Sequence, residues 1–384
     1  MSKSNETTPN VPTLRFAEYT DEWHKYALSD FVTRITRRNK NNESSLPLTI
    51  SAQYGLVDQI TFFNKTVASV DLSGYYLLYN GDFAYNKSYS NDYAWGAVKR
   101  LDKYEKGCLS SLYFVFRPTD KVDSDYLTHY FETSKWHKGI SDIAGEGARN
   151  HGLLNMAVDD YFATKHYLPS LSEQKKIACF LNLITKRIEI QNKIISDLKV
   201  LKKELNGFLI SRLIKGKESN CKIEDVIDYE QPTGYIVNSD KYIVDGETPV
   251  LTANKAFFLG YTNEKEGIYD KSDCIIFDDF TLDFKYVDFP FKVKSSAIKI
   301  LTAKKSIELR YFYEYLLFLN LNTNEHKRHY ISEIATLPLY LPSIDEQRRV
   351  LNVLNAISSK ITIEEKYKTT LQTQEKHFLS AMFI

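Results

Sequence analysis

Hydrophobic residues recur at alternating spacings of three and four, or at multiples of these, along two long stretches of the chain. The apolar positions are Ile177, Leu181, Ile184, Ile188, Ile195, Leu198, Leu205 and Leu209 in the first stretch, and Val350, Leu354, Ile357, Ile361, Leu371, Phe378 and Met382 in the second. A seam of this period is typical of helices that pair as a coiled coil. Neither stretch contains proline after its first turn, so the pattern predicts two long helices.

Both stretches begin with nearly the same amino-acid sequence, LPSLSEQKK at 168–176 and LPSIDEQRR at 341–349. Each sequence has the features of a helix start: a proline, an N-cap residue at Ser172 or Asp345, and an acidic residue in the first turn. Two copies of one helix on one chain predict a pseudo-twofold molecule whose helices pair antiparallel, because a globular region must fit between them. The residues expected to pair the helices are Leu181, Ile184, Ile188, Ile195, Leu198, Leu354, Ile357, Ile361 and Leu371.

Polar residues interrupt the seam at matching places. Gln191 and Glu364 fall at equivalent d positions, and Lys202 and Glu375 fall at nearby a positions. Buried polar groups at such positions fix the register of a coiled coil at some expense in stability. The alternative is that each helix packs only on its own domain.

In the globular region before each long helix, strand-like runs alternate with turns. Segments 75–79, 112–116, 242–244 and 274–277 have strand character, and segments 126–136 and 308–319 have helical character. This mixture predicts α/β (α+β) domains. We expect a mobile polar N-terminal lead over 1–22 with one short apolar anchor at 11–16. A first domain over 23–168, a first long helix over 169–217, a second domain over 218–341 and a second long helix over 342–384 should follow.

Composition and charge narrow the function. The 384 residues contain no apolar run long enough for a membrane span, and the four scattered cysteines are typical of a reducing cytoplasm. Lys and Arg outnumber Asp and Glu by 11 to 4 in 173–217, but acidic residues prevail by 19 to 14 in 220–341. The first helix could therefore attract a phosphate backbone, whereas the acidic balance of the second domain counts against a simple electrostatic binder of DNA.

Catalytic motifs of the common enzyme classes do not occur in the sequence. GxxxxGK[ST], HExxH and GxSxG are absent, and so are the Asn-Pro-Pro-aromatic and Asp-Pro-Pro-aromatic strings of amino-group methylation. His166 is expected in a core rather than on a metal. The pairs Asp159-Asp160 and Asp278-Asp279 could bind a cation, but each lies at a strand–turn junction where acidic residues are ordinary.

Several loops combine amides, cations and aromatic rings, which suits base recognition. Asn and Gln can bind adenine edges, and Arg and Lys can bind guanine edges or phosphates. The alternative is that these are ordinary hydrophilic loops. The predicted DNA-binding residues are Arg34, Arg37, Arg38, Lys87, Tyr89, Asn91, Tyr93, Arg149, Asn150, Gln231, Thr233, Tyr235, Asn254, Lys255, Lys285 and Lys294.

The chain resembles the specificity (DNA-recognition) subunit of a type I restriction–modification enzyme. The resemblance rests on the twin LPS-x-x-EQ openings, the long helices behind them and the two dissimilar globular regions. Segments 145–155 and 248–255 also resemble recognition-domain segments of that family. The resemblance covers residues 23–384, nearly the whole chain.

The resemblance implies that each globular region reads one half of a bipartite, asymmetric target in double-stranded DNA. It also implies that two methyltransferase (modification) subunits dock on the helices and that restriction (motor–nuclease) subunits join them. This chain would hold no cofactor and no metal and would have no catalytic residues, because S-adenosylmethionine, ATP and Mg belong to the partner subunits. The whole complex would be a DNA adenine methyltransferase and an ATP-dependent endonuclease in the cytoplasm.

Two other functions remain open from the residues alone. The chain could be a helical scaffold whose domains bind no DNA. It could also be an enzyme with an unrecognised active site, for instance around Asp278, Asp279 and Lys285.

Overall fold

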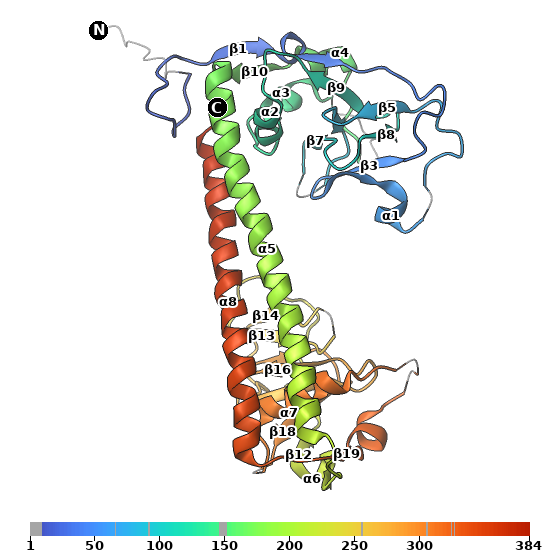
Figure 1. The fold of residues 1–384 in the computed structure, drawn as a ribbon, viewed down its shortest axis with the longest axis vertical. Helices are drawn as coiled ribbons and strands as arrows, with labels where there is room; N and C mark the ends of the chain where they lie inside the picture. The colour runs from blue at the N-terminus through green and yellow to red at the C-terminus, as the bar shows by residue number, and fades with distance from the viewer. Residues whose placement is uncertain are drawn as a thin grey trace. The chain divides into compact units, whose positions relative to one another are not determined.

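The computed structural model describes residues 10–65, 67–90, 93–145, 152–254, 256–304, 306–323, 325 and 327–384. The chain divides into two compact units, residues 1–192 with 367–384 and residues 193–366. The long helices α5 (Leu171–Ile214) and α8 (Ile344–Ala381) contribute to both units, and strands with short helices fill the rest of each (Figure 1). The prediction of α/β domains on long helices is confirmed.

The first unit combines small antiparallel sheets with short helices. Its main sheet has the order β2-β9-β6-β7, and β3-β4, β5-β8 and β1-β10 form separate pairs. The elements are β1 (His24–Ala27), η1 (Leu28–Asp30), β2 (Val32–Arg34), β3 (Leu48–Ser51), β4 (Gly55–Asp58), α1 (Gln59–Phe63), β5 (Tyr76–Tyr79), β6 (Phe83–Asn86), β7 (Ala97–Arg100), β8 (Lys106–Leu109), β9 (Phe114–Pro118), α2 (Ser124–Phe131), α3 (His137–Ile143), α4 (Val158–Ala163) and β10 (Lys165–Leu168).

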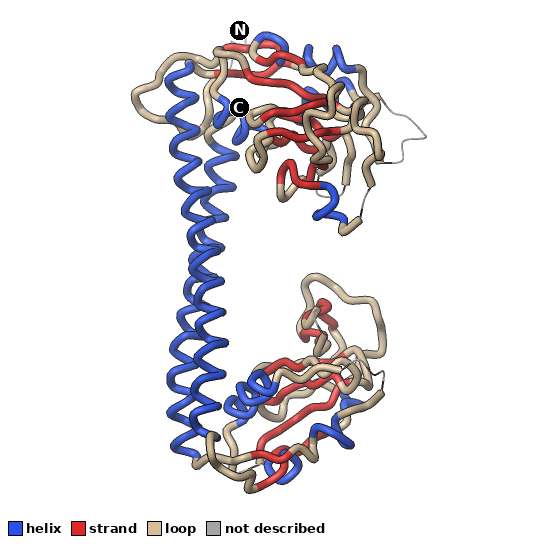
Figure 2. Tube along the Cα trace, turned by 45° about the vertical axis from the view of Figure 1, so that its right-hand side comes forward, coloured by secondary structure: helices blue, strands red, loops and turns tan. Residues whose placement is uncertain are grey.

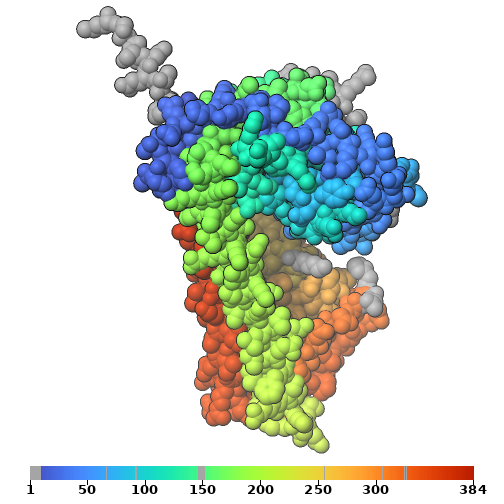
Figure 3. All heavy atoms as spheres, turned by 45° about the horizontal axis from the view of Figure 1, so that its top comes forward, coloured from blue at the N-terminus to red at the C-terminus, as the bar shows by residue number. Residues whose placement is uncertain are grey.

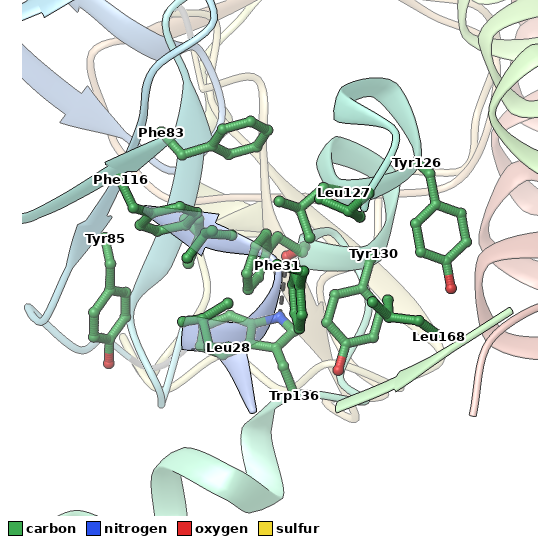
Figure 4. Close-up of a cluster of buried hydrophobic side chains, with 14 of the residues drawn as sticks. Leu28, Phe31, Phe83, Tyr85, Phe116, Tyr126, Leu127, Tyr130, Trp136 and Leu168 are labelled. Carbon is green, nitrogen blue, oxygen red and sulfur yellow. Dashed lines mark hydrogen bonds between the residues drawn. The ribbon is translucent and has the colours of Figure 1, made fainter. Parts of the chain in front are cut away.

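An aromatic core joins the main sheet of this unit to its helices (Figure 4). Phe83 and Phe116 stack with ring centroids 5.5 Å apart, and Tyr85 stacks on Tyr161 at 4.8 Å. Ile177 of α5 belongs to the same buried cluster. Large aromatic side chains contribute much of the apolar area that a core buries, so the long helix is part of the domain and not an appendage.

The second unit is built around a sheet of order β12-β18-β15-β16, beside a smaller sheet β14-β13-β17 and the pair β11-β19. Strand β15 has a buried cluster on each side, because Ile275 and Phe277 face one and Ile276 faces the other. The elements are β11 (Cys221–Lys222), α6 (Ile223–Val226), β12 (Ile227–Glu230), η2 (Pro232–Tyr235), β13 (Thr248–Leu251), β14 (Phe258–Thr262), β15 (Cys274–Asp278), β16 (Phe284–Val287), β17 (Lys292–Val293), β18 (Ile298–Ala303), α7 (Leu309–Leu319), η3 (Tyr330–Ile334) and β19 (Pro338–Leu339).

Most predicted segments correspond to elements, and one does not. The helix predicted over 308–319 is α7, and the strand predicted over 274–277 is β15. The strand predicted over 242–244 is wrong. Ile243 makes an isolated bridge to Tyr261, and the Asp245-Gly246 turn follows before a ladder can form.

The helices α5 and α8 pair antiparallel within each unit (Figure 2). In the first unit, Phe180 packs edge-on against Phe378, and further along α5 Arg187 lies over the ring of Tyr367. Positions therefore rise along one helix as they fall along the other. In the second unit, Lys199 forms an ion pair of 2.7 Å with Glu365. The predicted antiparallel pairing is confirmed.

Burial follows the predicted seam. Leu181, Ile188, Ile195, Leu354, Ile361 and Leu371 are buried, and Ile184, Leu198 and Ile357 are half-buried. Of the polar interruptions, Gln191 is buried, and Glu375 accepts a hydrogen bond of 2.7 Å from Thr185 across the helix pair. Lys202 instead turns to α7, where it pairs with Glu314 at 2.7 Å. It therefore ties its helix to the second domain.

The helix starts differ from the prediction. Ser172 and Asp345 lie inside the helices, and the residues directly before the first helical positions are Ser170 and Ser343. The Ser343 hydroxyl accepts the N–H of Glu346 at 3.3 Å, and the Glu346 carboxylate accepts the N–H of Ser343 at 3.0 Å. This reciprocal pair is a capping box, which the S-x-x-E spacing of both openings permits.

Residues 10–22, expected to be a mobile lead, are held against the first unit (Figure 3). Arg15 donates two hydrogen bonds of 2.7 and 2.8 Å to the buried carboxylate of Glu173. The N–H of Leu14 donates to the carbonyl of Ala381 at 3.0 Å. These bonds lie within the expected anchor at 11–16. Glu18 also pairs with Lys176 of α5, so the expectation of mobility is wrong for the described residues beyond the anchor.

In the part of the chain that the structure describes, helices of sufficient length and apolar character to cross a bilayer are absent.

Candidate nucleic-acid interface

The loop between β6 and β7 carries the predicted residues Lys87, Tyr89 and Tyr93. The N–H of Tyr89 donates to the carbonyl of Gly152 at 2.9 Å, and the N–H of Leu154 donates to the carbonyl of Lys87 at 3.0 Å. The loop is therefore joined to the segment that follows residue 151. The ammonium of Lys87 lies over an aromatic ring of β9, 4.8 Å from its centroid, and the Tyr89 ring is exposed.

Four predicted residues, Asn91, Arg149, Asn150 and Lys255, lie outside the described residues.

The arginines after the first strand of the main sheet have unlike surroundings. Arg34 ends β2 and is exposed. The Arg38 guanidinium lies 4.4 Å from the centroid of the Tyr76 ring. Arg37 is bonded to the buried carboxylate of Asp82, so it belongs to the fold as well as to the surface.

Asp82 binds a second arginine, Arg117 of β9, which the sequence analysis missed. Asp82 Oδ1 accepts from Arg117 Nε at 2.6 Å, and Oδ2 accepts from Arg37 Nη2 and from the N–H of Tyr79. Arg37 Nε donates to the Leu77 carbonyl at 2.8 Å. No local motif could have shown this cluster, because Arg37 follows β2, Asp82 precedes β6 and Arg117 lies on β9, far apart along the chain.

In the second unit, the predicted residues Gln231, Thr233 and Tyr235 share one short loop. Gln231 Oε1 accepts from the buried ammonium of Lys299 at 3.0 Å, and the Tyr235 hydroxyl donates to Glu230 at 2.7 Å. Thr233 is exposed. The loop is thus held at both ends by side-chain bonds, with its middle facing solvent.

Lys299 also reaches Asp279, at 3.3 Å, and both side chains are fully buried. Asp279 Oδ1 accepts the backbone N–H groups of His329 and Tyr330 at 3.0 and 2.7 Å. The exposed Arg328 lies 3.7 Å from the same carboxylate. Sequence reasoning missed Lys299 and Arg328, because a lysine inside a strand pattern gives no sign of its partner.

The remaining predicted cations of this unit lie in different sheets. The N–H of Lys294 donates to the carbonyl of Leu251 at 3.1 Å, which places Lys294 and Asn254 together at the end of β13. Lys285 pairs with Ile276 in the larger sheet, at its β16 edge. The structure therefore does not bring Lys285 into one group with the other two.

The proposed acidic active site finds no support in this geometry. Asp278 Oδ1 accepts the backbone N–H groups of Phe280 and Thr281 at 2.9 and 3.0 Å, as a turn-forming aspartate does. Asp279 is engaged in the bonds given above, and Lys285 lies on another strand. Groups of three or more His, Cys, Asp or Glu that could hold a metal ion are not found among the residues that the structure describes.

His166 is a satisfied core residue, as expected. Its Nδ1 and Nε2 atoms lie 2.8 Å from the hydroxyls of Tyr130 and Thr164. The Thr164 hydroxyl donates to the carbonyl of Tyr161 at 2.7 Å, so it accepts from Nε2–H, and Nδ1 accepts from Tyr130. Burial lowers the pKa of His166 to about 4, because the charged imidazolium loses its hydration.

The repeated glutamines Gln174 and Gln347 make the same contacts in both units. Gln174 Oε1 accepts the N–H of Asp123, the N-cap of α2, and Gln347 Oε1 accepts the N–H of Glu308, the N-cap of α7, each at 2.8 Å. The side-chain amide of each glutamine donates to the carbonyl of the proline five residues before it. Both glutamines are fully buried. We call this repeated contact the glutamine joint.

Comparison with known proteins gives the repeat a context. Residues 216–373 match the model of the type I restriction modification DNA specificity domain. A relative from Escherichia coli, the specificity subunit of the type I restriction enzyme EcoR124I/EcoR124II, is 37% identical over 186 residues. That alignment covers 44% of this chain, and the chain spans 44% of the length of the relative.

Solved structures share the fold over nearly the whole chain. The S subunit of a type I restriction–modification system from M. genitalium has a TM-score of 0.57 and 15% identity, with 97% of this chain and 99% of that chain covered. A chain from a study of complex assembly and conformational transition in a type I system has a TM-score of 0.54 and 16% identity, with 93% and 96% covered. Within residues 216–373 the chain is thus similar to the type I restriction modification DNA specificity domain, and over nearly its whole length it shares the fold of these two solved chains.

Proposed function

We propose that this chain is a non-catalytic, sequence-specific DNA-binding subunit that reads a bipartite, asymmetric target. The observation that carries the proposal is the glutamine joint, which fixes two domains to the long helices by the same bonds. The domains differ in the polar groups that they carry away from the joint. In the first domain Arg37 and Arg117 bind Asp82, and in the second Gln231 accepts a hydrogen bond from Lys299. Two domains that are attached to the helices in the same way but carry different polar groups are suited to reading two different DNA half-sites independently.

We further propose that two methyltransferase subunits dock on the long helices and that restriction subunits join them. Support comes from an apolar row on α5 within the second unit, Ile194, Leu201 and Phe208, which we call the α5 stripe. Their exposed fractions are 39%, 47% and 58%. Positions seven apart lie on one face of a helix, and this face is about a quarter turn from the pairing seam. S-adenosylmethionine, ATP and Mg would be bound by those partners.

The α5 stripe also favours a second candidate, a helical scaffold whose domains bind no DNA. An exposed apolar row is a protein-binding feature and does not by itself call for nucleic acid.

A gel-shift assay with a random DNA pool separates the two candidates. The chain is mixed with the pool, with and without a methyltransferase subunit of its own system, and bound DNA is sequenced. A DNA reader enriches two fixed sequences with a fixed gap between them. A scaffold binds the methyltransferase but enriches no sequence, and that result would refute the proposed function.

A further inference from the structure

Asp82 holds the guanidinium groups of Arg37 and Arg117 in one fixed arrangement. The carboxylate is fully buried, at 0% exposure, and it lies directly before β6. Its Oδ1 binds Arg117 Nε at 2.6 Å and its Oδ2 binds Arg37 Nη2. A carboxylate that receives two guanidinium groups fixes their orientation more tightly than either exposed side chain could fix itself.

Each guanidinium has a second anchor in the main chain. Arg37 Nε donates to the Leu77 carbonyl at 2.8 Å, and Arg117 Nη2 donates to the Asn80 carbonyl at 3.1 Å. The Tyr79 ring lies under Arg37, 4.4 Å from the guanidinium carbon, and adds a flat support. Neither arginine can rotate without breaking these contacts.

These bonds use one edge of each guanidinium and leave the other open. The donors engaged within the described residues are Nε and Nη2 in both Arg37 and Arg117. The outer edge, formed by Nη1 and the second hydrogen of Nη2, is available in both. Their side chains are 33% and 42% exposed, so a ligand can reach that edge, and two cations against one carboxylate leave a net positive charge.

Arg100 of the same sheet shows the contrasting case. Its Nε donates to Asp102 at 2.6 Å, and its Nη1 donates to Ser124 at 2.9 Å and to Asp125 at 2.6 Å. Its outer edge is therefore engaged, and its side chain is 18% exposed. An arginine that serves the fold alone has its donors used in this way.

We propose that Arg37 and Arg117 form a guanine-reading site in the first domain, with Asp82 as the positioning residue; this inference rests on the proposed function. An open guanidinium edge matches the O6 and N7 acceptors of guanine in the major groove. A phosphate contact would need charge but not a fixed edge, whereas base readout needs both, and the buried carboxylate supplies the fixed edge.

The test uses the full chain with its methyltransferase partner and the target selected from the random pool. Each guanine of the target is replaced in turn by 7-deazaguanine, which lacks the N7 acceptor. The wild-type complex should lose roughly 5- to 100-fold in affinity at one or two guanines of one half-site. In the Arg117→Lys complex, the affinity should no longer depend on N7 at one of these positions, because lysine keeps the charge but lacks the two-donor edge.

Arg100→Lys is the matched control and should keep the wild-type dependence on N7 at every guanine. Arg37→Lys gives a second, independent reading if Arg117→Lys lowers the thermal midpoint. The proposal is overturned if no guanine of the target depends on N7, or if both lysine variants keep the full dependence. It is also overturned if Arg117→Ala weakens all duplexes by one factor and lowers the salt slope by about one, since that result identifies a phosphate contact. A wild-type complex without any preferred sequence would instead refute the proposed function.

Discussion

At the scale of single residues, Asp279 and Lys299 show how the second domain stabilises a charge in its interior. Both side chains are 1% exposed, and their 3.3 Å ion pair joins the Gln231 loop to the segment that begins η3. Removing one member of a buried pair leaves the other charge without compensation, which costs far more than the pair itself contributes.

Asp279→Asn should therefore lower the free energy of unfolding by about 3–5 kcal/mol, since it leaves the Lys299 ammonium buried without an anionic partner. Asp278→Asn is the control, because an amide oxygen can still accept the two N–H bonds of that turn. Its cost should stay below about 1 kcal/mol. Urea unfolding of both variants measures the difference, and equal losses would contradict this account.

His166 gives the first domain a dependence on pH. Its pKa is about 4 in the folded chain and about 6.5 when unfolded, because burial favours the neutral ring. The unfolded chain thus binds more protons between these values, so stability is full above pH 6.5 and falls as the pH drops toward 4. The loss should reach about 3 kcal/mol.

This pH dependence is checked by measuring the free energy of unfolding of the wild type and of His166→Gln between pH 4 and pH 7. The buried His129 also has a lowered pKa and adds a loss of the same sign in both proteins. The difference between the two curves should therefore be largest near neutral pH and shrink toward pH 4. Parallel curves would show that folding does not lower the pKa of His166.

At the scale of elements, the glutamine joint connects a long helix to a short one in each unit. Gln347 leaves the N–H of Glu308 and the carbonyl of Pro342 without partners if it is shortened. Gln347→Ala and Gln174→Ala should each cost about 1–3 kcal/mol, by the same mechanism in different domains. Gln347→Glu should cost more, because it buries a charge and cannot donate to the proline carbonyl. Denaturant unfolding that shows an effect for one glutamine alone would contradict a shared joint.

The α5 stripe yields a test of partner docking. Leu201→Asp with Phe208→Asp should abolish co-purification with the methyltransferase subunit, because a charge would replace apolar contact area. The helices should still pair, since these side chains point away from the seam. Val200→Asp is the matched control, an exposed valine about a quarter turn from Leu201. Normal co-purification of the double variant would exclude the stripe as the docking surface.

The elements show what a sequence can reveal and what it cannot. The seam was predictable because burial of Ile188 and Ile361 repeats with the helical period, and that period is visible along the chain. Asp82, in contrast, lies in an Asn-Gly-Asp sequence, which locally indicates only a turn. Its partners Arg37 and Arg117 lie 45 and 35 positions away. The pairing of β9 with β6 brings Arg117 to Asp82, and bonds between Arg37 and Leu77 of β5 hold Arg37 in place.

At the scale of the whole molecule, the two domains should act as separate readers. Replacing residues 223–340 with the second domain of a specificity subunit that the chain resembles should change one half-site and leave the other as it was. The reason is that each domain has its own core and its own glutamine joint. Bound-site selection with the hybrid measures this, and a change in both half-sites would mean that the domains form one reading surface.

The glutamine joint also has a consequence for an exchange of one domain for another. Its contacts to the domain on the α7 side are to the carbonyl of Ser306 and the N–H of Glu308, and both are main-chain groups. Because every amino acid except proline supplies both of those groups, the joint places almost no restriction on the side chains of an incoming domain. If an exchanged gene segment ended within the codons of the repeated LPS-x-x-EQ sequence, the new domain would therefore form the same glutamine contacts with the long helix. If each domain reads its own half-site as proposed, an exchanged domain would bring its specificity with it, without compensating mutations in the helices.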